Sequence, residues 1–349
     1  MSKKIIAVLM VAVLAFSLVA CTDSGKSNEG TKESDLKIAM VTDVGGVNDQ
    51  SFNQSAWEGL QQVEKDLGVK VSYQESHQDA DFVPNLETLV DAENDMIWGI
   101  GFKLSDAIKE AAEKNPDTKY GIVDFAYGDE TPENAVGVVF KAEQPSFLVG
   151  YIAAKMTETG TVGFVGGMEG DVIWGFDYGY QAGVAYANKV NGTDVKVLRQ
   201  YAESFNDAAK GKAITNSMYQ QGADIVFHAA GGVGDGVIEA AKEQDKWAIG
   251  VDRDQNYMAP DNVLTSAMKR VDQGIYLVVK DLVDGKFPGG ETVVLGLKEG
   301  AVDIAPTSDK HVPKEILDEV EGLKKDIIDE KIVVPVNEKT FEEYLETLE

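Results

Sequence analysis

The chain is poor in the residue types on which many catalytic sites depend. Its 349 residues include one cysteine, Cys21, and three histidines that lie far apart, His77, His228 and His311. This scarcity excludes a Cys–His nucleophile pair and the usual cysteine and histidine spacings of zinc sites. The Gly-x-Ser-x-Gly elbow of α/β-hydrolases is also missing. We therefore expect no metal site and no cofactor, and the available side-chain chemistry is mainly that of carboxylates, amides and aromatic rings.

Basic residues are also scarce, with 32 Lys and Arg against 59 Asp and Glu, which gives a net charge of −27. Such an acidic chain is a poor partner for nucleic acid, anionic lipid headgroups or phosphorylated ligands. A neutral or cationic solute is compatible with it. Beyond residue 20 no apolar run approaches the about 20 residues that span a membrane, so the chain is not predicted to form a channel.

The first residues have the pattern of a secretory signal. Two lysines precede an uncharged apolar run, 5–20, which ends in Leu-Val-Ala before Cys21. Leu-x-Ala-Cys is typical of bacterial lipoprotein signals, in which the cysteine is acylated. We therefore expect residues 1–20 to be a signal peptide and Cys21 to anchor the chain at the extracytoplasmic face of the cell membrane. An ordinary signal with a chance cysteine, or an uncleaved anchor helix, is the alternative.

Residues 21–35 are expected to form a lipidated, flexible tether. After Cys21 they read TDSGKSNEGTKESD, with no aliphatic or aromatic side chain. Such a segment cannot bury a core and stays solvated.

From Leu36 onward, short apolar runs alternate with segments of helix length. The predicted strands are 37–43, 69–75, 96–101, 119–125, 135–140, 161–167, 195–202, 225–231, 247–252, 263–269 and 292–297. The predicted helices are 51–66, 104–115, 145–158, 176–190, 207–221, 235–244 and 271–284. This alternation predicts an α/β fold of mostly parallel sheets flanked by helices on both faces.

The pattern occurs twice, and each half begins with a strand that runs into a glycine-rich turn. Two such lobes place a ligand between them, outside the carboxyl ends of the strands. The additional strands and helix after residue 262 indicate that the chain crosses back between the lobes. The predicted organisation is lobe one at 36–141 plus 268–286 and lobe two at 142–267 plus 287–349. One long doubly wound sheet is the alternative.

Three acidic residues, Asp43, Asp124 and Asp252, come at the ends of apolar strands. Because such ends gather where α/β sheets bind ligands, we expect the three carboxylates to lie near one another. Ionised carboxylates only accept hydrogen bonds and suit a ligand rich in hydroxyl or amine donors, such as a sugar or a nucleoside. Three independent caps or loop residues are the alternative.

Aromatic residues near helix starts are candidates for stacking. Phe52 opens the helix after Asp43, whereas Asp49 and Ser51 are more readily explained as caps of that helix. Trp174 and Phe176 are candidates for the opposite face of an aromatic sandwich, although such residues are also common in cores.

Two further segments could approach a ligand. Gly231 and Gly232 belong to a four-glycine segment after a strand, which matches no phosphate-binding motif and is interpreted as a backbone wall against a neutral ligand. Lys269 ends the strand 263–269 and could partner a carboxylate or donate to the ligand. A solvated basic pair with Arg270 is the alternative.

Three segments carry a family resemblance: VTDVGGVNDQSFNQSAWEGL (41–60), HAAGGVGDGVIEAAKE (228–243) and GVDRDQ (250–255). They closely resemble the basic membrane protein/Med family of lipoproteins and, within it, the purine nucleoside receptor (PnrA-like) branch. The resemblance implies a two-lobed type I periplasmic-binding-protein fold, a nucleoside ligand and an ABC transporter permease as partner. The lipoprotein signal and the scarcity of catalytic groups predict a binding protein without enzymatic activity. We expect the receptor to be a monomer.

The resemblance also implies roles for individual residues in lobe one. Asp43 and Asp124 are expected to make polar contacts to the ligand, and Phe52 to stack on its base. Asn53 is a further ligand-contact candidate.

In lobe two and at the crossing, the resemblance implies that Asp252 binds the ribose hydroxyls and that Gly231 and Gly232 line the pocket. Lys269 is expected to contact the ligand or a carboxylate. Trp174 and Phe176 match no family motif, so the second stacking residue is open.

Two other functions stay open. A monosaccharide receptor would share the architecture. A nucleoside hydrolase would use an aspartate-rich first loop that binds calcium, but here Gly45 and Gly46 separate Asp43 from Asp49.

Overall fold

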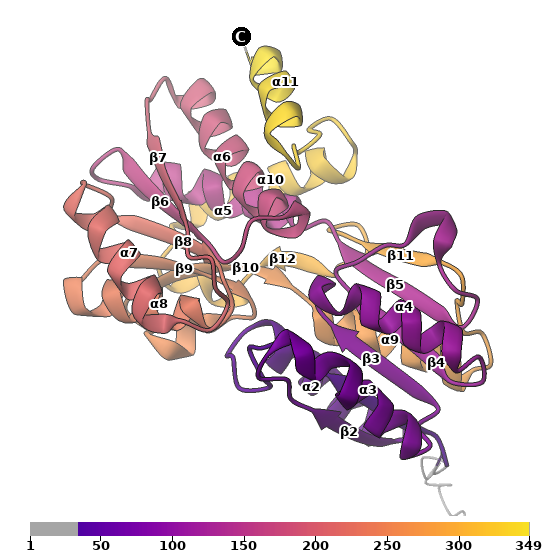
Figure 1. Cartoon of the computed structure of the whole chain (residues 1–349). Helices are drawn as coiled ribbons and strands as arrows, with labels where there is room; N and C mark the ends of the chain where they lie inside the picture. Colours follow the sequence, from indigo (N-terminus) through magenta and orange to yellow (C-terminus); the bar gives the residue numbers. More distant parts are fainter. Residues whose placement is uncertain (1–33, 349) are drawn as a thin grey trace, which may run out of the picture. The chain divides into compact units, whose positions relative to one another are not determined.

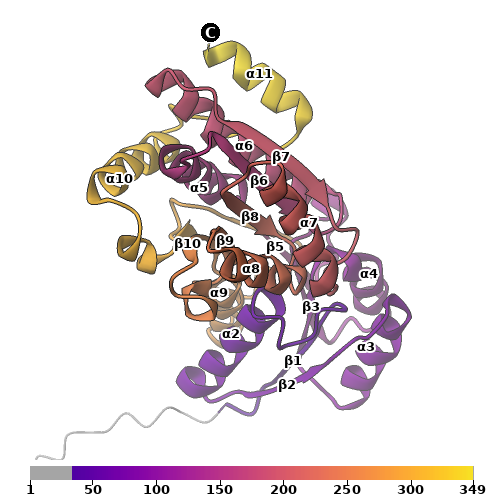
Figure 2. The same ribbon diagram turned by 90° about the vertical axis from the view of Figure 1, so that its left-hand side faces the viewer.

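The computed structural model describes residues 34–348. Within this range the chain forms two six-stranded sheets, each covered by helices on both faces (Figures 1 and 2). This confirms the predicted mostly parallel sheets flanked by helices, and the alternative of one long sheet is wrong. In the same range, no helix has the length and apolar character needed to cross a membrane. The predicted signal peptide, the lipidation of Cys21 and most of the tether lie outside the described residues.

The first sheet, with its helices, is called lobe one below. Its strands are all parallel, in the order β11-β5-β4-β3-β1-β2. They are β1 (Lys37–Val41), β2 (Lys70–Gln74), β3 (Met96–Ile100), β4 (Lys119–Val123), β5 (Ala135–Phe140) and β11 (Thr292–Leu295). One face is covered by α2 (Phe52–Leu67) and α9 (Val271–Val283), and the other by α3 (Phe82–Asp91) and α4 (Ser105–Lys114). Because both faces are covered, β1 is apolar throughout after its first lysine.

The second sheet, with its helices, is called lobe two. Its order is β12-β10-β9-β8-β6-β7, and only β12 runs antiparallel to its neighbour. The strands are β6 (Thr161–Gly166), β7 (Lys196–Tyr201), β8 (Ile225–Ala229), β9 (Trp247–Asp252), β10 (Val263–Lys269) and β12 (Val302–Ile304). The helices are α5 (Glu143–Met156), α6 (Asp171–Asn191), α7 (Ala208–Gln220), α8 (Val233–Gln244), α10 (Lys314–Ile328) and α11 (Glu338–Leu348).

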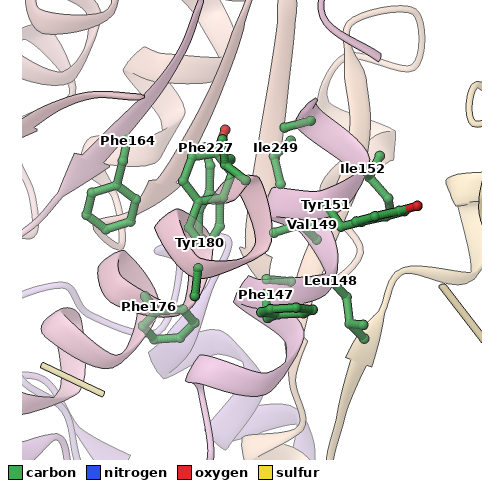
Figure 3. Close-up of a cluster of buried hydrophobic side chains, with 14 of the residues drawn as sticks. Phe147, Leu148, Val149, Tyr151, Ile152, Phe164, Phe176, Tyr180, Phe227 and Ile249 are labelled. Carbon is green, nitrogen blue, oxygen red and sulfur yellow. The ribbon is translucent and has the colours of Figure 1, made fainter. Parts of the chain in front are cut away.

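The core of lobe two is rich in aromatic side chains (Figure 3). Phe147 of α5 and Tyr180 of α6 are buried with Phe164 and Phe227 of the sheet. The rings of Tyr180 and Phe227 are 5.2 Å apart between centroids. This packing fixes α6, whose first turns reach the carboxyl ends of the strands.

The sheet pairing corrects the predicted lobe boundaries. β10 pairs with β9 through Met268 and with β12 at Lys269, so both residues belong to lobe two rather than lobe one. β11 pairs in parallel with β5, with Thr292 opposite Gly137, so Thr292–Leu295 belongs to lobe one rather than lobe two. This pairing satisfies the backbone groups along one side of β5, which would otherwise be an open edge.

Candidate ligand-binding site

A cavity lies between the carboxyl ends of the two sheets. Its wall includes the predicted residues Asp43, Phe52, Asn53, Asp124, Phe176, Gly231, Asp252 and Lys269. These eight residues come from both lobes. The fold thus gathers in one place most of the candidates that the sequence indicated.

Asp124, which directly follows β4, and Asp252, which ends β9, have the same unusual backbone conformation. Asp124 has φ of +64° and Asp252 has φ of +63°, in the left-handed region that favours glycine. Both residues are less than 10% exposed. Strain of this kind persists only where the surroundings hold it, and it is common at functional sites. Here it turns both carboxylates toward the same lysine.

Lys269 is that lysine, and only 2% of it is exposed. Its Nζ lies 2.6 Å from Asp124 Oδ2 and 3.8 Å from Asp252 Oδ1. The ammonium also lies 4.5 Å from the ring centroid of Phe52 and 5.5 Å from that of Phe176, within cation–π range. Lys269 therefore bridges carboxylates of the two lobes.

Burial raises the pKa of Asp252 to about 6, although Lys269 and a hydrogen bond from Ser51 lower it. The Ser51 hydroxyl that donates to Asp252 comes from the residue before α2, so this bond also joins the lobes. A carboxylate that is buried and only partly compensated is ready to accept hydrogen bonds from ligand hydroxyls.

Asp43 and Asn53 form a second polar group on the lobe-one wall. Asp43 Oδ1 accepts hydrogen bonds from the Gly45 N–H at 2.9 Å and from Asn53 Nδ2 at 2.8 Å. Burial raises the pKa of Asp43 to about 6, which these hydrogen bonds oppose. Asn53 Nδ2 also donates to Asp49, so the amide is held in one orientation. In the described part of the chain, the buried Asn53 Oδ1 has no hydrogen-bond donor.

Asp49 has the capping role that the sequence favoured. Its carboxylate accepts hydrogen bonds from the backbone N–H groups of Ser51, Asn53 and Gln54 at the start of α2. It also lines the cavity. The Asp49 carboxylate therefore both caps α2 and holds the Asn53 side chain in place.

Two aromatic residues of the wall were not predicted, Phe102 and Phe205. Phe102 follows β3 and Phe205 follows β7, so they come from different lobes, and their rings meet edge to face at 6.4 Å. A Cβ on Gly167 would lie 2.2 Å from the Phe205 ring, so only glycine at 167 allows this ring position. A signal was present for Phe102, which lies two residues beyond β3, as Asp43 lies two residues beyond β1, whereas Phe205 lies four residues beyond β7.

Two predicted residues do not line this cavity, Gly232 and Trp174. Gly231, with φ of +55°, lines it, whereas Gly232 already begins the turn into α8. Trp174 and Phe176 lie about 200° apart around α6, at about 100° per residue, so they cannot face the same cavity. Phe176 is the inward one, and 2% of it is exposed.

The geometry and the comparisons with known proteins agree. The family model described as ABC transporter substrate-binding protein PnrA-like matches residues 36–338. Basic membrane protein A of Borreliella burgdorferi is 40% identical over 341 residues, which cover 97% of this chain and 98% of that protein. The ABC transporter nucleoside-binding protein BmpA of Lactococcus lactis subsp. cremoris is 41% identical, covering 96% of this chain and 99% of that protein.

Among solved structures, an ABC transporter system solute-binding protein from Aeropyrum pernix has a TM-score of 0.79 and 30% identity. That match covers 90% of this chain and 97% of that one. A cavity between two α/β lobes of this kind defines a two-lobed solute receptor with the type I periplasmic-binding-protein fold. The chain belongs to the PnrA-like family of ABC transporter substrate-binding proteins.

Proposed function

We propose that this protein captures a nucleoside, with a purine base, between its two lobes and delivers it to an ABC transporter permease. The observation that carries the proposal is the composition of the cavity wall: aromatic rings from both lobes next to buried acceptor groups. The name of the Lactococcus relative, a nucleoside-binding protein, supports the same ligand class.

The cavity wall has groups suited to each half of a nucleoside, the base and the ribose. Phe52 and Phe205 provide ring faces for the base. Asp252 and the Lys269–Asp124 pair provide a charged acceptor and a donor for the ribose hydroxyls. Both lobes must contribute contacts, because a ligand held equally well by open and closed forms does not shift the equilibrium between them.

The edge of the base is expected to face Asp43 and Asn53. Both groups present acceptors, and the unpaired Asn53 Oδ1 requires an N–H donor. Purine nucleosides have such donors, as an exocyclic amine in adenosine and as a ring N–H in inosine and guanosine. Inosine should therefore bind more tightly than 1-methylinosine, which lacks that ring N–H.

The proposed receptor has no enzymatic activity and acts as a monomer, held at the extracytoplasmic face of the cell membrane by lipid on Cys21. A mutant with Cys21→Ser should lose membrane association while its purified form keeps nucleoside affinity. Equal membrane association of mutant and wild type would contradict the anchor.

The ligand is tested by a thermal-shift screen of nucleosides, ribose, galactose and AMP. A ligand at 100 times its dissociation constant should stabilise the fold by about 2.7 kcal/mol. Purine nucleosides are expected to do so, whereas AMP meets an acidic wall and is not. Stabilisation by ribose or galactose and by no nucleoside would replace the proposal by a monosaccharide receptor. Release of free base from inosine, followed by chromatography, would instead indicate a hydrolase.

A further inference from the structure

Beside the cavity, a second group of contacts joins the lobes without lining the cavity itself. It involves Gln50 and Glu58 of lobe one and Arg253, Gln255 and Tyr257, which follow β9 in lobe two. The contacts lie between the start of α2 and the turn after Asp252.

Three hydrogen bonds or ion pairs cross between the lobes here. Arg253 Nη2 lies 2.6 Å from Glu58 Oε1. The Tyr257 hydroxyl donates to Gln50 Oε1 at 2.5 Å, and Gln255 Nε2 donates to the Gln50 carbonyl at 3.1 Å. Gln50 accepts both of these crossing hydrogen bonds from a left-handed backbone conformation, with φ of +55°. A non-glycine residue keeps this conformation at a cost, which the two bonds offset.

Gln255 connects these contacts to the ligand cavity. It is fully buried, and its Oε1 accepts from the Val251 N–H at 2.9 Å and pairs with His228 Nε2 at 3.0 Å. Val251 directly precedes Asp252, which has the left-handed backbone. One amide side chain thus supports the Asp252 turn and crosses to lobe one at the same time.

The crossing also brings negative charges together. Burial and the nearby Asp49 of lobe one raise the pKa of Asp235, in the first turn of α8, to about 6. Bringing the lobes together therefore costs electrostatic free energy, and contacts outside the ligand cavity must offset part of it. Arg253 places a positive charge on this side of the cleft.

We propose that Gln50, Glu58, Arg253, Gln255 and Tyr257 form a latch that holds the lobes together beside the cavity and sets the residence time of the ligand. In addition, Gln255 is a positioning residue for Asp252. The proposal rests on nucleoside binding in the cavity for its kinetic part only, because the distance between the lobes can be measured without any ligand.

The test uses Tyr257→Phe and Arg253→Met, which remove latch contacts but no cavity wall. Controls are Tyr127→Phe, whose hydroxyl bonds Ser105 within lobe one, and Lys212→Met, whose ammonium pairs with glutamates within lobe two. Each latch variant should release inosine about threefold faster, and the double variant about tenfold faster, with little change in association rate. The controls should release it at the wild-type rate.

Spin labels on α3 and α8 report the distance between the lobes in the same proteins, with and without inosine. The latch variants should shift the ligand-free distribution toward longer distances. Unchanged distances together with unchanged release would overturn the latch. If wild-type protein binds no nucleoside, the proposed function fails, whereas the ligand-free distances still decide whether the latch exists.

Gln255→Met separates positioning from latching. It should reduce the preference for a ribonucleoside over its 2′-deoxy analogue, because the Asp252 turn loses its support, while Tyr257→Phe should keep that preference. Circular dichroism and melting of Gln255→Met establish that it folds. An unchanged preference in the folded variant would overturn the positioning role. If Gln255→Met does not fold, Ser266→Ala replaces it in the same comparison. This substitution removes the hydroxyl that accepts a hydrogen bond from the Gln255 backbone N–H.

Discussion

Asp252 combines burial, a left-handed backbone and a hydrogen bond from the opposite lobe. Few residues of a fold carry all three features unless a function requires them. Asp252→Ala should weaken nucleoside binding by about 2–4 kcal/mol, or about 30- to 1000-fold, because ribose hydroxyls lose a charged acceptor in a desolvated cavity. Isothermal titration measures the change.

The matched control is Asp245→Ala. Asp245 also has a left-handed backbone, with φ of +51°, but it is the exposed C-cap of α8. Both substitutions replace an aspartate that tolerates the left-handed backbone conformation, but only Asp252 lines the cavity. Affinity within threefold of wild type in Asp252→Ala would show that the pocket is wrongly assigned.

Phe52 and Phe205 should contribute comparable stacking energies. Each alanine variant is expected to lose about 1–3 kcal/mol of affinity, as base stacking on aromatic platforms does. Phe341→Ala, which removes a ring that packs on Tyr178 outside the cavity wall, is the control and should bind normally. A large effect of Phe52→Ala with none of Phe205→Ala would restrict the stacking to one ring.

The sequence located the aspartates and Phe52 because each lies within a short, predictable distance of a strand end or a helix start. Phe205 escaped because it lies four residues beyond β7, in a connection whose path no local pattern defines. Trp174 and Phe176 were equivalent candidates until the register of α6 separated their directions. The direction of a side chain depends on the register of its helix, and the sequence pattern did not define the register of α6.

At the scale of elements, β5, β9 and β10 begin and end at the predicted residues. β5, and β9 up to Asp252, are uninterrupted apolar runs, as expected of buried parallel strands. Three helices, α3, α10 and α11, were not predicted individually. The lobe assignment of β11 failed for another reason. A run such as Thr-Val-Val-Leu predicts a strand, but its partner is set by the long-range path of the chain, which local periodicity does not record.

Gly167, which directly follows β6, determines where a side chain of the cavity wall can lie. Because a methyl group at 167 would lie 2.2 Å from the Phe205 ring, Gly167→Ala should displace that ring from the cavity wall. Nucleoside affinity should then fall about as far as in Phe205→Ala, and combining the two substitutions should add little. Titration of both single variants and the double variant measures this coupling.

Gly322→Ala is the control for Gly167→Ala. A Cβ at 322, within α10, would meet nothing within 4 Å, and alanine favours a helix by about 0.5–1 kcal/mol. Its affinity should match wild type and its melting temperature should rise. Full affinity in Gly167→Ala would mean that Phe205 moves without consequence for the ligand.

For the whole molecule, two of the buried carboxyls in the cavity wall, Asp43 and Asp252, are harder to ionise than exposed ones. The net charge is −27, and burial, followed by repulsion from nearby carboxylates, raises the pKa values of Asp43 and Asp252 to about 6. Holding ionised carboxylates in the cavity at neutral pH therefore costs folding stability. The proposed function explains why the cost is tolerated, since the ionised form is the better acceptor for a ligand.

Asp43→Asn tests this cost through its pH dependence. Below about pH 3 the Asp43 carboxyl is mostly protonated in both the folded and the unfolded chain, so the variant and the wild type should have similar unfolding free energies. As the pH rises from the ordinary pKa of 3.8 through about 6, the unfolded chain ionises first, and the wild type loses up to about 2–3 kcal/mol that the variant keeps. Ligand-free Asp43→Asn should therefore be the more stable protein at pH 7.5 and yet bind nucleoside more weakly. Urea unfolding at pH 3, 6 and 7.5 measures the effect on stability, and titration measures the effect on nucleoside binding. The control for overall charge is Asp171→Asn, an exposed residue in the first turn of α6. A stability difference that stays constant across this pH range would contradict an ionised, desolvated Asp43.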